Sequence, residues 1–233
     1  MPKPKLVVLS GAGISAESGI PTFRDADGLW EGHDVMEVAS PQGWTSNPEL
    51  VLEFYNQRRK AALNARPNKG HQILAELEQH FEVTIVTQNV DNLHEEAGSS
   101  QVVHLHGELF KSRSTKYPEL VYQMSGWELK LGDLCEKGYQ LRPHIVWFGE
   151  EVPMMEYAIS ITQQADIFVV VGTSLVVYPA AGLMNFVANQ VSKYVIDPNM
   201  PDVYPVPNLN LINKGGGEGL TELRQKLLND YGW

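Results

Sequence analysis

The chain has 233 residues, of which 43% are hydrophobic and 20% are charged, and this composition is typical of a globular protein rather than a disordered one. Its 18 Lys and Arg residues against 28 Asp and Glu residues give a net charge of −10, which argues against generic binding to nucleic-acid phosphates. The single cysteine, Cys135, excludes an internal disulfide framework and any zinc site built from two thiolates of one chain.

No apolar segment approaches the roughly 18 residues that a membrane-spanning helix needs. The apolar run near the N-terminus, Leu6–Leu9, is also far too short for the core of a secretory signal peptide. We therefore expect a cytoplasmic protein that binds neither membranes nor nucleic acids. The sequence does not indicate an oligomeric state.

Short runs rich in β-branched residues predict the strands. Most of these runs are continuously apolar rather than alternating, which is typical of strands buried on both faces of a parallel sheet. The predicted strands are Lys5–Leu9, Val83–Thr87, Val102–Leu105, Ile145–Phe148, Ile167–Val171, Tyr194–Ile196 and Leu209–Ile212.

Helical patterns lie between these strands. Asn47 and Pro48 are typical of a helix start, with Asn as the N-cap and Pro at the first helical position. Gly98 and the glycines at 215–217 lie where we expect turns. The predicted helices are Glu49–Ala65, His71–Gln79, Asp91–Ala97, Met154–Gln164, Pro179–Asn189 and Gly219–Leu228.

Two segments interrupt the alternation of strands and helices. Trp30–Gln79 has helical patterns but no predicted strand, and Gly107–Arg142 is polar and rich in turns. We predict an α/β fold: a Rossmann-like, doubly wound parallel sheet with a small inserted module of helices and loops. The sheet domain would comprise residues 1–29, 80–106 and 143–233, and the module residues 30–79 and 107–142.

A pair of glycines, Gly11 and Gly13, follows the first predicted strand and precedes a helix. Such a pair lets backbone N–H groups approach a pyrophosphate. No Gly-Lys-Ser or Gly-Lys-Thr follows, so the segment is not a Walker A loop. A tight turn between strand and helix explains the same glycines equally well.

Five further segments occur in a specific order along the chain. Together they resemble the sirtuins, a family of NAD-dependent protein lysine deacylases, and the resemblance extends through nearly the whole chain. The segments are Gly19–Asp25, Thr87–His94, His104–Gly107, Val146–Glu150 and Gly172–Pro179.

The resemblance implies that NAD is a co-substrate and that the reaction yields nicotinamide, free lysine and O-acyl-ADP-ribose. It assigns His106 as the general base, and imidazole suits proton removal from a hydroxyl near neutral pH. Alternation along the strand places His104 on the same face, so position alone does not decide between the two histidines. The glycine after His106 and the family pattern favour His106. Asn89 and Asp91, the other expected catalytic residues, also fit an ordinary helix start.

The resemblance also implies a set of cofactor-binding residues. Phe23 and Arg24 lie on the loop that covers the nicotinamide site in this family, and Asp197 stands at the adenosine-ribose position, where sirtuins more often carry Asn. The full set is Gly11, Ala12, Gly13, Ser15, Glu17, Thr22, Phe23, Arg24, Trp30, Gln88, Asn89, Asp91, Gly172, Thr173, Ser174, Asp197 and Gly216.

The resemblance also implies a set of residues that bind the acyl-lysine substrate. Tyr55 and Arg58 are three apart on a predicted helix and so share a face, although a solvated basic run at 58–60 is the simpler explanation. The Tyr-x-x-Arg pattern at this place marks the sirtuins that remove succinyl, malonyl or glutaryl groups, and Ala39 resembles the small residue of their wider acyl pocket. An extended peptide would lie between two segments, with contacts from Val146, Phe148, Gly149, Val176 and Tyr178.

Sirtuins usually hold the small module with four cysteines around zinc. Here Ser114 and Tyr117 stand where the first pair is expected, and the second pair is reduced at most to Cys135, which an ordinary buried thiol explains better. We therefore expect no structural zinc, with the module held by apolar contacts instead.

Two alternatives are a non-catalytic module that binds NAD or ADP-ribose and a protein mono-ADP-ribosyltransferase. The joint presence of His106, Asn89 and Asp91 weighs against the first, and neither a substituted histidine nor a lost acyl channel supports the second. A dehydrogenase is weaker still, because no constellation for hydride transfer is present.

Overall fold

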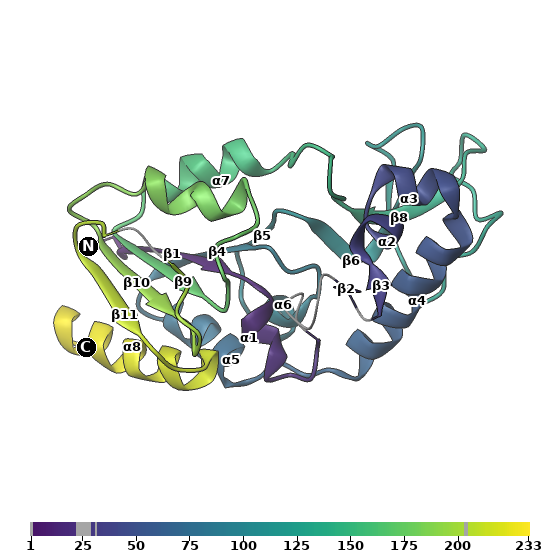
Figure 1. Ribbon diagram of the computed structural model, residues 1–233. Helices are drawn as coiled ribbons and strands as arrows, with labels where there is room; N and C mark the ends of the chain where they lie inside the picture. The colour runs from purple at the N-terminus through teal and green to yellow at the C-terminus, as the bar shows by residue number, and fades with distance from the viewer. Residues whose placement is uncertain (1, 22–28, 31, 203–204) are drawn as a thin grey trace.

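The computed structural model describes residues 2–21, 29–30, 32–202 and 205–233. Its larger part is built on a six-stranded parallel sheet with the strand order β11-β10-β9-β1-β4-β5 (Figure 1). The strands are β1 (Lys5–Ser10), β4 (Glu82–Thr87), β5 (Val102–His104), β9 (Ile167–Val171), β10 (Ser192–Ile196) and β11 (Leu209–Ile212).

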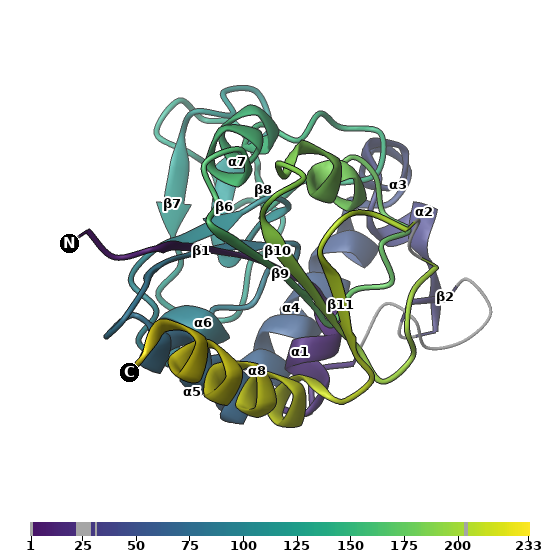
Figure 2. The same ribbon diagram turned by 90° about the vertical axis from the view of Figure 1, so that its left-hand side faces the viewer.

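Helices cover both faces of this sheet, as the continuous apolar strands predict. One face packs on α5 (Lys69–Leu77) and α8 (Gly216–Tyr231), with Ile73, Leu74 and Leu220 fully buried. The other face packs on α7 (Met155–Thr162) and the 3-10 helix η1 (Ala180–Phe186). Figure 2 shows α5 and α8 together on one side of the strands and α7 on the opposite side. The predicted doubly wound α/β fold is confirmed.

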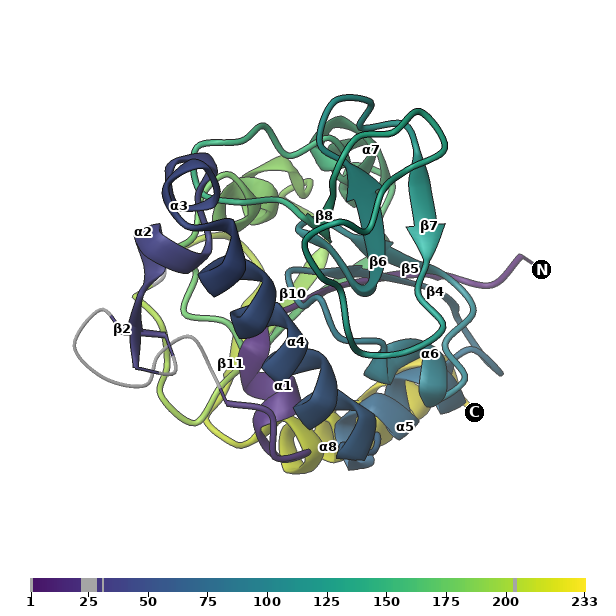
Figure 3. The same ribbon diagram turned by 90° about the vertical axis from the view of Figure 1, so that its right-hand side faces the viewer.

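The smaller part contains a three-stranded antiparallel sheet with the order β7-β6-β8. Its own apolar cluster includes Val51, Phe54, Leu109, Ile145 and Trp147. Figure 3 shows α4 alongside these strands. The elements are β6 (Gly107–Ser114), β7 (Val121–Gln123), β8 (Leu141–Ile145), the hairpin strands β2 (Leu29–Trp30) and β3 (His33–Asp34), and the helices α2 (Val35–Val38), α3 (Pro41–Ser46) and α4 (Pro48–Asn64).

Helix α4 begins as its sequence predicts. The Asn47 side chain accepts a hydrogen bond of 3.1 Å from the backbone N–H of Leu50, and Pro48 is the first helical residue. The N-cap therefore satisfies one of the backbone donors that a helix start leaves unpaired.

Two of the three residues in the basic run at 58–60 are buried, and only Lys60 is exposed. Arg59 is fully buried and donates hydrogen bonds to the carbonyl oxygens of Trp127 at 2.6 Å and Leu109 at 3.2 Å. Its third donor contacts Asn56 Oδ1 at 2.6 Å, and Asn56 also binds the backbone of Leu129. Arg59 and Asn56 thus join α4 to β6 and to the loop that follows β7.

Several predicted elements are wrong in detail. Ile145–Phe148 is not a strand of the parallel sheet, because β8 ends at Ile145 and pairs with β6. Segment 30–79 contains the strand β3, and segment 107–142 contains β6 and β7, which the sequence did not indicate because polar side chains interrupt them. Helix α8 begins at Gly216, so two of the glycines assigned to a turn form its first residues.

Two observed contacts cross the predicted boundaries between the sheet domain and the module. The boundary between 142 and 143 falls inside β8, whose residues pair with β6 of the small sheet. Helix α5, placed by the prediction in the small module, packs on the parallel sheet through Ile73, Leu74 and Leu77.

The two remaining helices, α1 (Ala12–Ala16) and α6 (Leu93–Glu96), lie just after β1 and β4. Within the part of the chain that the structure describes, no helix is long and apolar enough to span a membrane.

Candidate active site

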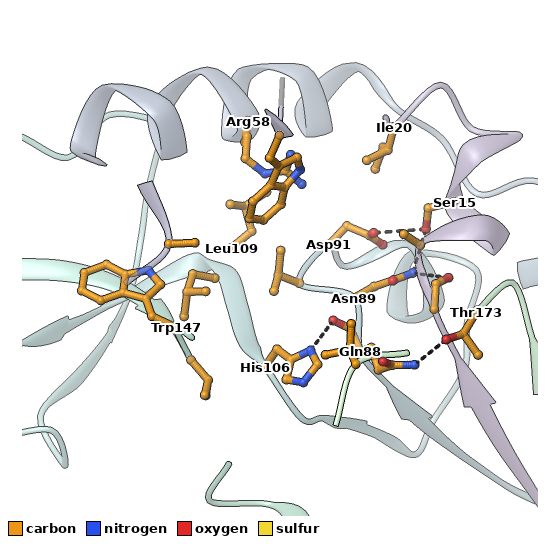
Figure 4. Close-up of a pocket in the computed structure, with 18 of the residues that line it drawn as sticks. Ser15, Ile20, Arg58, Gln88, Asn89, Asp91, His106, Leu109, Trp147 and Thr173 are labelled. Atoms are coloured by element: carbon orange, nitrogen blue, oxygen red, sulfur yellow. Dashed lines mark hydrogen bonds between the residues drawn. The ribbon is translucent and has the colours of Figure 1, made fainter. Parts of the chain in front are cut away.

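A cleft opens at the carboxyl ends of the parallel strands, between them and the small module (Figure 4). This is the usual place for a ligand in an open α/β sheet, because the loops that leave the strands converge there. It brings together these residues singled out from the sequence: Gly11, Ala12, Gly13, Ser15, Trp30, Ala39, Tyr55, Arg58, Gln88, Asn89, Asp91, His106, Val146, Phe148, Gly149, Gly172, Thr173, Ser174 and Tyr178.

The paired glycines have a packing role of their own. A Cβ atom on Gly11 would lie 2.6 Å from Thr173 Cβ, and one on Gly13 would lie 2.7 Å from Gly172 Cα. The backbone N–H of Gly13 donates to the carbonyl oxygen of Gly172 at 2.7 Å. The glycines therefore let the turns after β1 and β9 touch, and any larger residue would push the two walls of the cleft apart.

Asn89 and Asp91 are held by the turn after β1. Asn89 Nδ2 donates to Gly11 O and to Ser15 Oγ, each at 3.1 Å. Ser15 Oγ in turn donates to Asp91 Oδ2 at 3.1 Å, and Asp91 Oδ1 accepts from the backbone N–H of Leu93 at 3.2 Å. Figure 4 shows the Asn89 and Asp91 side chains side by side facing Ser15.

The pKa of the Asp91 carboxyl is raised. The residue is only 6% exposed, and burial raises the pKa of its carboxyl, while the bonds from Leu93 and Ser15 and the charge of His104 oppose that rise. Since both amide hydrogens of Asn89 are engaged by the protein, its Oδ1 is the atom that remains to accept from a ligand.

Gln88 bridges two loops across the floor of the cleft. Its side-chain Nε2 donates to Thr173 Oγ1 at 3.1 Å, and Thr173 Oγ1 also accepts from the backbone N–H of Leu175 at 3.2 Å. The loops after β4 and β9 are thereby tied together, as Figure 4 shows for Gln88 and Thr173.

His106 follows β5 and contacts the backbone of Gln88. Its Nδ1 lies 3.1 Å from Gln88 O, which can only accept, so Nδ1 carries the proton and Nε2 carries the lone pair. Burial lowers the pKa of His106, and the Gln88 bond offsets this only in part. The neutral form with a basic Nε2 is thus the stable form near pH 7.

Tyr55 and Arg58 both reach the cleft from α4. Tyr55 is fully buried, and burial raises its pKa to about 12. The Arg58 guanidinium lies over the Trp30 ring, 4.2 Å from its centroid, and is also 5.7 Å from the Phe54 ring. Both side chains therefore bring hydrogen-bond donors to the cleft.

Some of the selected residues lie elsewhere. Glu17 accepts from the backbone N–H of Gly217 at 3.2 Å, beside Gly216 at the start of α8, and none of these three lines the cleft. Asp197 is 1% exposed and its Oδ1 accepts from the backbone N–H of Asn199. Val176 is 68% exposed beside the cleft. Thr22, Phe23 and Arg24 fall outside the described residues.

The sequence did not single out the apolar wall near Tyr55 and Arg58. Trp147 Nε1 donates to Tyr55 Oη at 3.1 Å, and Leu109 is 2% exposed. In the sequence these residues look like ordinary core residues. An apolar lining can be recognised only when the elements that face each other are known. The residues concerned are Ala61, Ala62, Val90, Leu109, Ile145 and Trp147.

The region of Cys135 has a hydrogen-bonded arrangement. The buried Cys135 Sγ contacts Ser114 Oγ at 3.4 Å, and Ser114 Oγ accepts from the backbone N–H groups of Lys116 and Tyr117 at 3.3 and 3.2 Å. Among the described residues, no group of three or more His, Cys, Asp or Glu side chains is arranged to hold a metal ion.

A profile of the Sir2 family matches residues 11–179 of the chain. An NAD-dependent protein deacylase of Helicobacter pylori (strain ATCC 700392 / 26695) is 56% identical over 225 residues, covering 96% of this chain and 97% of its own. One from Bacteroides thetaiotaomicron is 53% identical over 228 residues, covering 96% and 97%.

Solved structures give the same result. A complex of a Sir2 homologue with NAD is similar at a TM-score of 0.87 and 40% identity, covering 98% of this chain and 91% of that one. A mutant Sir2 homologue bound to ADP-ribose reaches a TM-score of 0.89 at 39% identity, covering 99% and 94%.

Proposed function

Because the chain belongs to the Sir2 family and is an NAD-dependent protein deacylase, we propose that the cleft at the carboxyl ends of the strands is its active site. The observation that carries the proposal is the position of His106 beside Asn89 and Asp91 in one cleft. The residues that follow are assigned on that basis.

The polar groups of the cleft fit NAD. Amide, hydroxyl and carboxylate groups of Ser15, Asn89 and Asp91 suit a carboxamide and ribose hydroxyls, and Thr173 and Ser174 suit ribose and phosphate. When bound, NAD supplies nicotinamide as a leaving group and a ribose whose hydroxyls can be deprotonated. Complexes of similar Sir2 homologues with NAD and with ADP-ribose support this assignment.

His106 acts as the general base. Its Nδ1–H is fixed by Gln88 O, and its lowered pKa leaves Nε2 unprotonated at neutral pH. Nε2 therefore takes a proton from a ribose hydroxyl, a contribution worth about 10²–10⁴ in rate. Asn89 and Asp91 hold the nicotinamide and ribose while this occurs.

The acyl-lysine of a protein substrate enters from the exposed side of the cleft. Phe148, Val176 and Tyr178 are 39%, 68% and 74% exposed there, which suits an extended peptide held between segments 146–149 and 175–178. A structure similar at 28% identity and a TM-score of 0.79 is of a Sir2 protein with a deacetylated peptide.

The cytoplasmic location expected from the sequence belongs to the same proposal and is tested by cell fractionation.

Tyr55 and Arg58 select acyl groups that carry a carboxylate. The guanidinium is the one cation among the described residues that line the cleft, and the buried Tyr55 hydroxyl, with its pKa of about 12, stays a neutral donor. A hydrogen bond to a charged group contributes about 1.5–3 kcal/mol, so succinyl- or malonyl-lysine should be preferred over acetyl-lysine by about ten- to a hundredfold.

The test is nicotinamide release from NAD with matched acetyl-, succinyl- and malonyl-lysine peptides. We expect release that requires acyl-lysine and is lost in His106→Ala, and Arg58→Met should reduce desuccinylation selectively. Release without any acyl-lysine would overturn the active-site proposal and favour ADP-ribosyl transfer to another acceptor. An equal loss on acetyl- and succinyl-lysine in Arg58→Met would overturn the role of Arg58 alone.

A further inference from the structure

His104 is held between two groups that can only accept hydrogen bonds. Its Nδ1 lies 2.9 Å from the carbonyl oxygen of Asn89, and its Nε2 lies 2.7 Å from Glu95 Oε1. A neutral imidazole has one N–H and could satisfy one of these contacts; the other would bring two lone pairs together. Both contacts are satisfied at once when the ring is an imidazolium.

We propose that His104 is an imidazolium that positions the Asn89–Asp91 turn of the active site. The proposal rests on the proposed roles of Asn89 and Asp91, since it is through them that His104 would affect the reaction. His104 itself lines no part of the cleft and is a positioning residue.

The surroundings of His104 favour the positive charge. Three carboxylates lie around it: Glu95 from α6, Asp91 from the turn after β4 and Glu108 from β6. Two groups oppose a positive charge there: His94, and Lys111, which pairs with Glu108 at 2.7 Å. Burial pulls the pKa of His104 down, but the hydrogen bond and charge of Glu95, the bond to Asn89 O and the charge of Glu108 together raise it. Burial raises the pKa of Glu95, but the bond and charge of His104, the bond from its own backbone N–H and the charge of Lys111 together lower it.

The position of His104 explains how its charge reaches the active site. His104 is paired with Thr87 across β4 and β5, and its ring reaches the turn that follows Thr87 through the contact with Asn89 O. It lies in a hollow that shares Val90, Asp91 and Leu109 with the main cleft, so these three residues form the wall between the two. One N–H fixes the backbone of Asn89, and the charge opposes the effect of burial on Asp91.

His106 provides the internal contrast. It contacts the carbonyl oxygen of Gln88 through Nδ1, as His104 contacts that of Asn89, but it lines the cleft, and its pKa is lowered. Two histidines two residues apart, one at the end of β5 and one just after it, thus contact successive carbonyl groups, one as a cation and the other as a neutral ring.

The first test is the charge of the ring. In protein labelled with ¹⁵N in its histidine rings, with His104 assigned through His104→Gln, we expect both ring nitrogens of His104 to be protonated at pH 7.5. In Glu95→Gln, the carboxylate is replaced by an amide that can donate to Nε2, so the pKa of His104 should fall. A neutral His104 at pH 7.5 in the unaltered protein would overturn the proposal whatever the activity.

The second test is the pH profile of the reaction. Because the raised pKa means that the charge is lost as pH rises, we expect an alkaline limb that Glu95→Gln moves to lower pH, and His104→Gln should lower kcat/KM for NAD by about tenfold. Glu96→Gln, a neighbouring exposed carboxylate on the same helix, is the matched control and should leave the profile unchanged. An unchanged profile in Glu95→Gln would overturn the positioning role.

Failure of the proposed function gives a different result. Acyl-dependent nicotinamide release that persists in His106→Ala would show that His106 is not the general base. The charge of His104 is measured separately, from the resonances of its own ring. The two outcomes are therefore distinguishable in the same preparations.

Discussion

The Trp147 indole donates a hydrogen bond of 3.1 Å from Nε1 to Tyr55 Oη. This contact uses one lone pair of the Tyr55 hydroxyl and leaves its proton free to be donated. Because burial raises the pKa of Tyr55 to about 12, the hydroxyl keeps that proton throughout the working pH range of most enzymes. Trp147 thus orients a neutral donor beside the Arg58 guanidinium.

Tyr55→Phe tests this arrangement. Removal of the hydroxyl should lower kcat/KM for a succinyl-lysine peptide by about tenfold, the value of a hydrogen bond to a charged group, and should change deacetylation by less than about twofold. Rates with the two matched peptides measure the effect, and Tyr157→Phe, at an exposed tyrosine of α7, is the control. Equal losses on both peptides would mean that Tyr55 contributes packing and not recognition.

Acid pH should destabilise the fold through His71. This residue is fully buried, its Nδ1 accepts from the backbone N–H of Asn68, and burial lowers its pKa from 6.5 to about 4. The unfolded chain binds a proton at this site below pH 6.5, but the native protein does so only near pH 4. Stability is therefore lost as pH falls through this window, by about 2 kcal/mol at pH 5 from His71 alone.

Denaturant unfolding at pH 7.5 and pH 5.0 measures this loss. His71→Asn keeps an acceptor for the Asn68 N–H and removes the titrating group, so its stability should depend less on pH although it is lower at pH 7.5. The same pH dependence in His71→Asn as in the unaltered protein would assign the acid loss to other groups, of which the buried His94 is the first to examine.

Arg59 should be important for stability and not for recognition. Burial lowers its pKa only to about 10, so the buried guanidinium stays charged and keeps its bonds to Trp127 O, Leu109 O and Asn56. Arg59→Met leaves these acceptors without their donor and should lower the free energy of unfolding by about 3 kcal/mol. Gln57→Met, on the exposed side of the same helix, should change it by less than about 0.5 kcal/mol. Comparable unfolding midpoints for the two variants would contradict the role of Arg59.

Chelation should leave the enzyme intact. Ser114 and Cys135 are joined by a hydrogen bond, with Ser114 Oγ also bound to the backbone of Lys116 and Tyr117. We therefore expect dialysis against EDTA to change neither the melting temperature nor the deacylation rate, and metal analysis of the purified protein to find less than about 0.1 equivalent of zinc. One bound equivalent, with a lowered melting temperature after its removal, would show that the module is held by a metal after all.

Sequence patterns alone were enough to predict the parallel sheet, the start of α4 and many of the residues that line the cleft. Continuous apolar runs predicted β1 and β9, because burial on both faces leaves a local signature in composition. Asn47 and Pro48 predicted a helix start through capping, which is also local. The small antiparallel sheet was missed, because its strands are half-exposed and pair over long separations, as Arg113 does with Arg142.

The roles of neighbouring residues of the same type depend on their tertiary contacts. Arg58 and Arg59 are adjacent, yet Arg58 lines the cleft and Arg59 is buried against the backbone of β6 and the loop after β7. His104 and His106 are two residues apart, and they differ because α6 places Glu95 against Nε2 of His104 while His106 lines the cleft. Charge state and accessibility depend on partners from distant segments, and a local pattern in the sequence does not contain them.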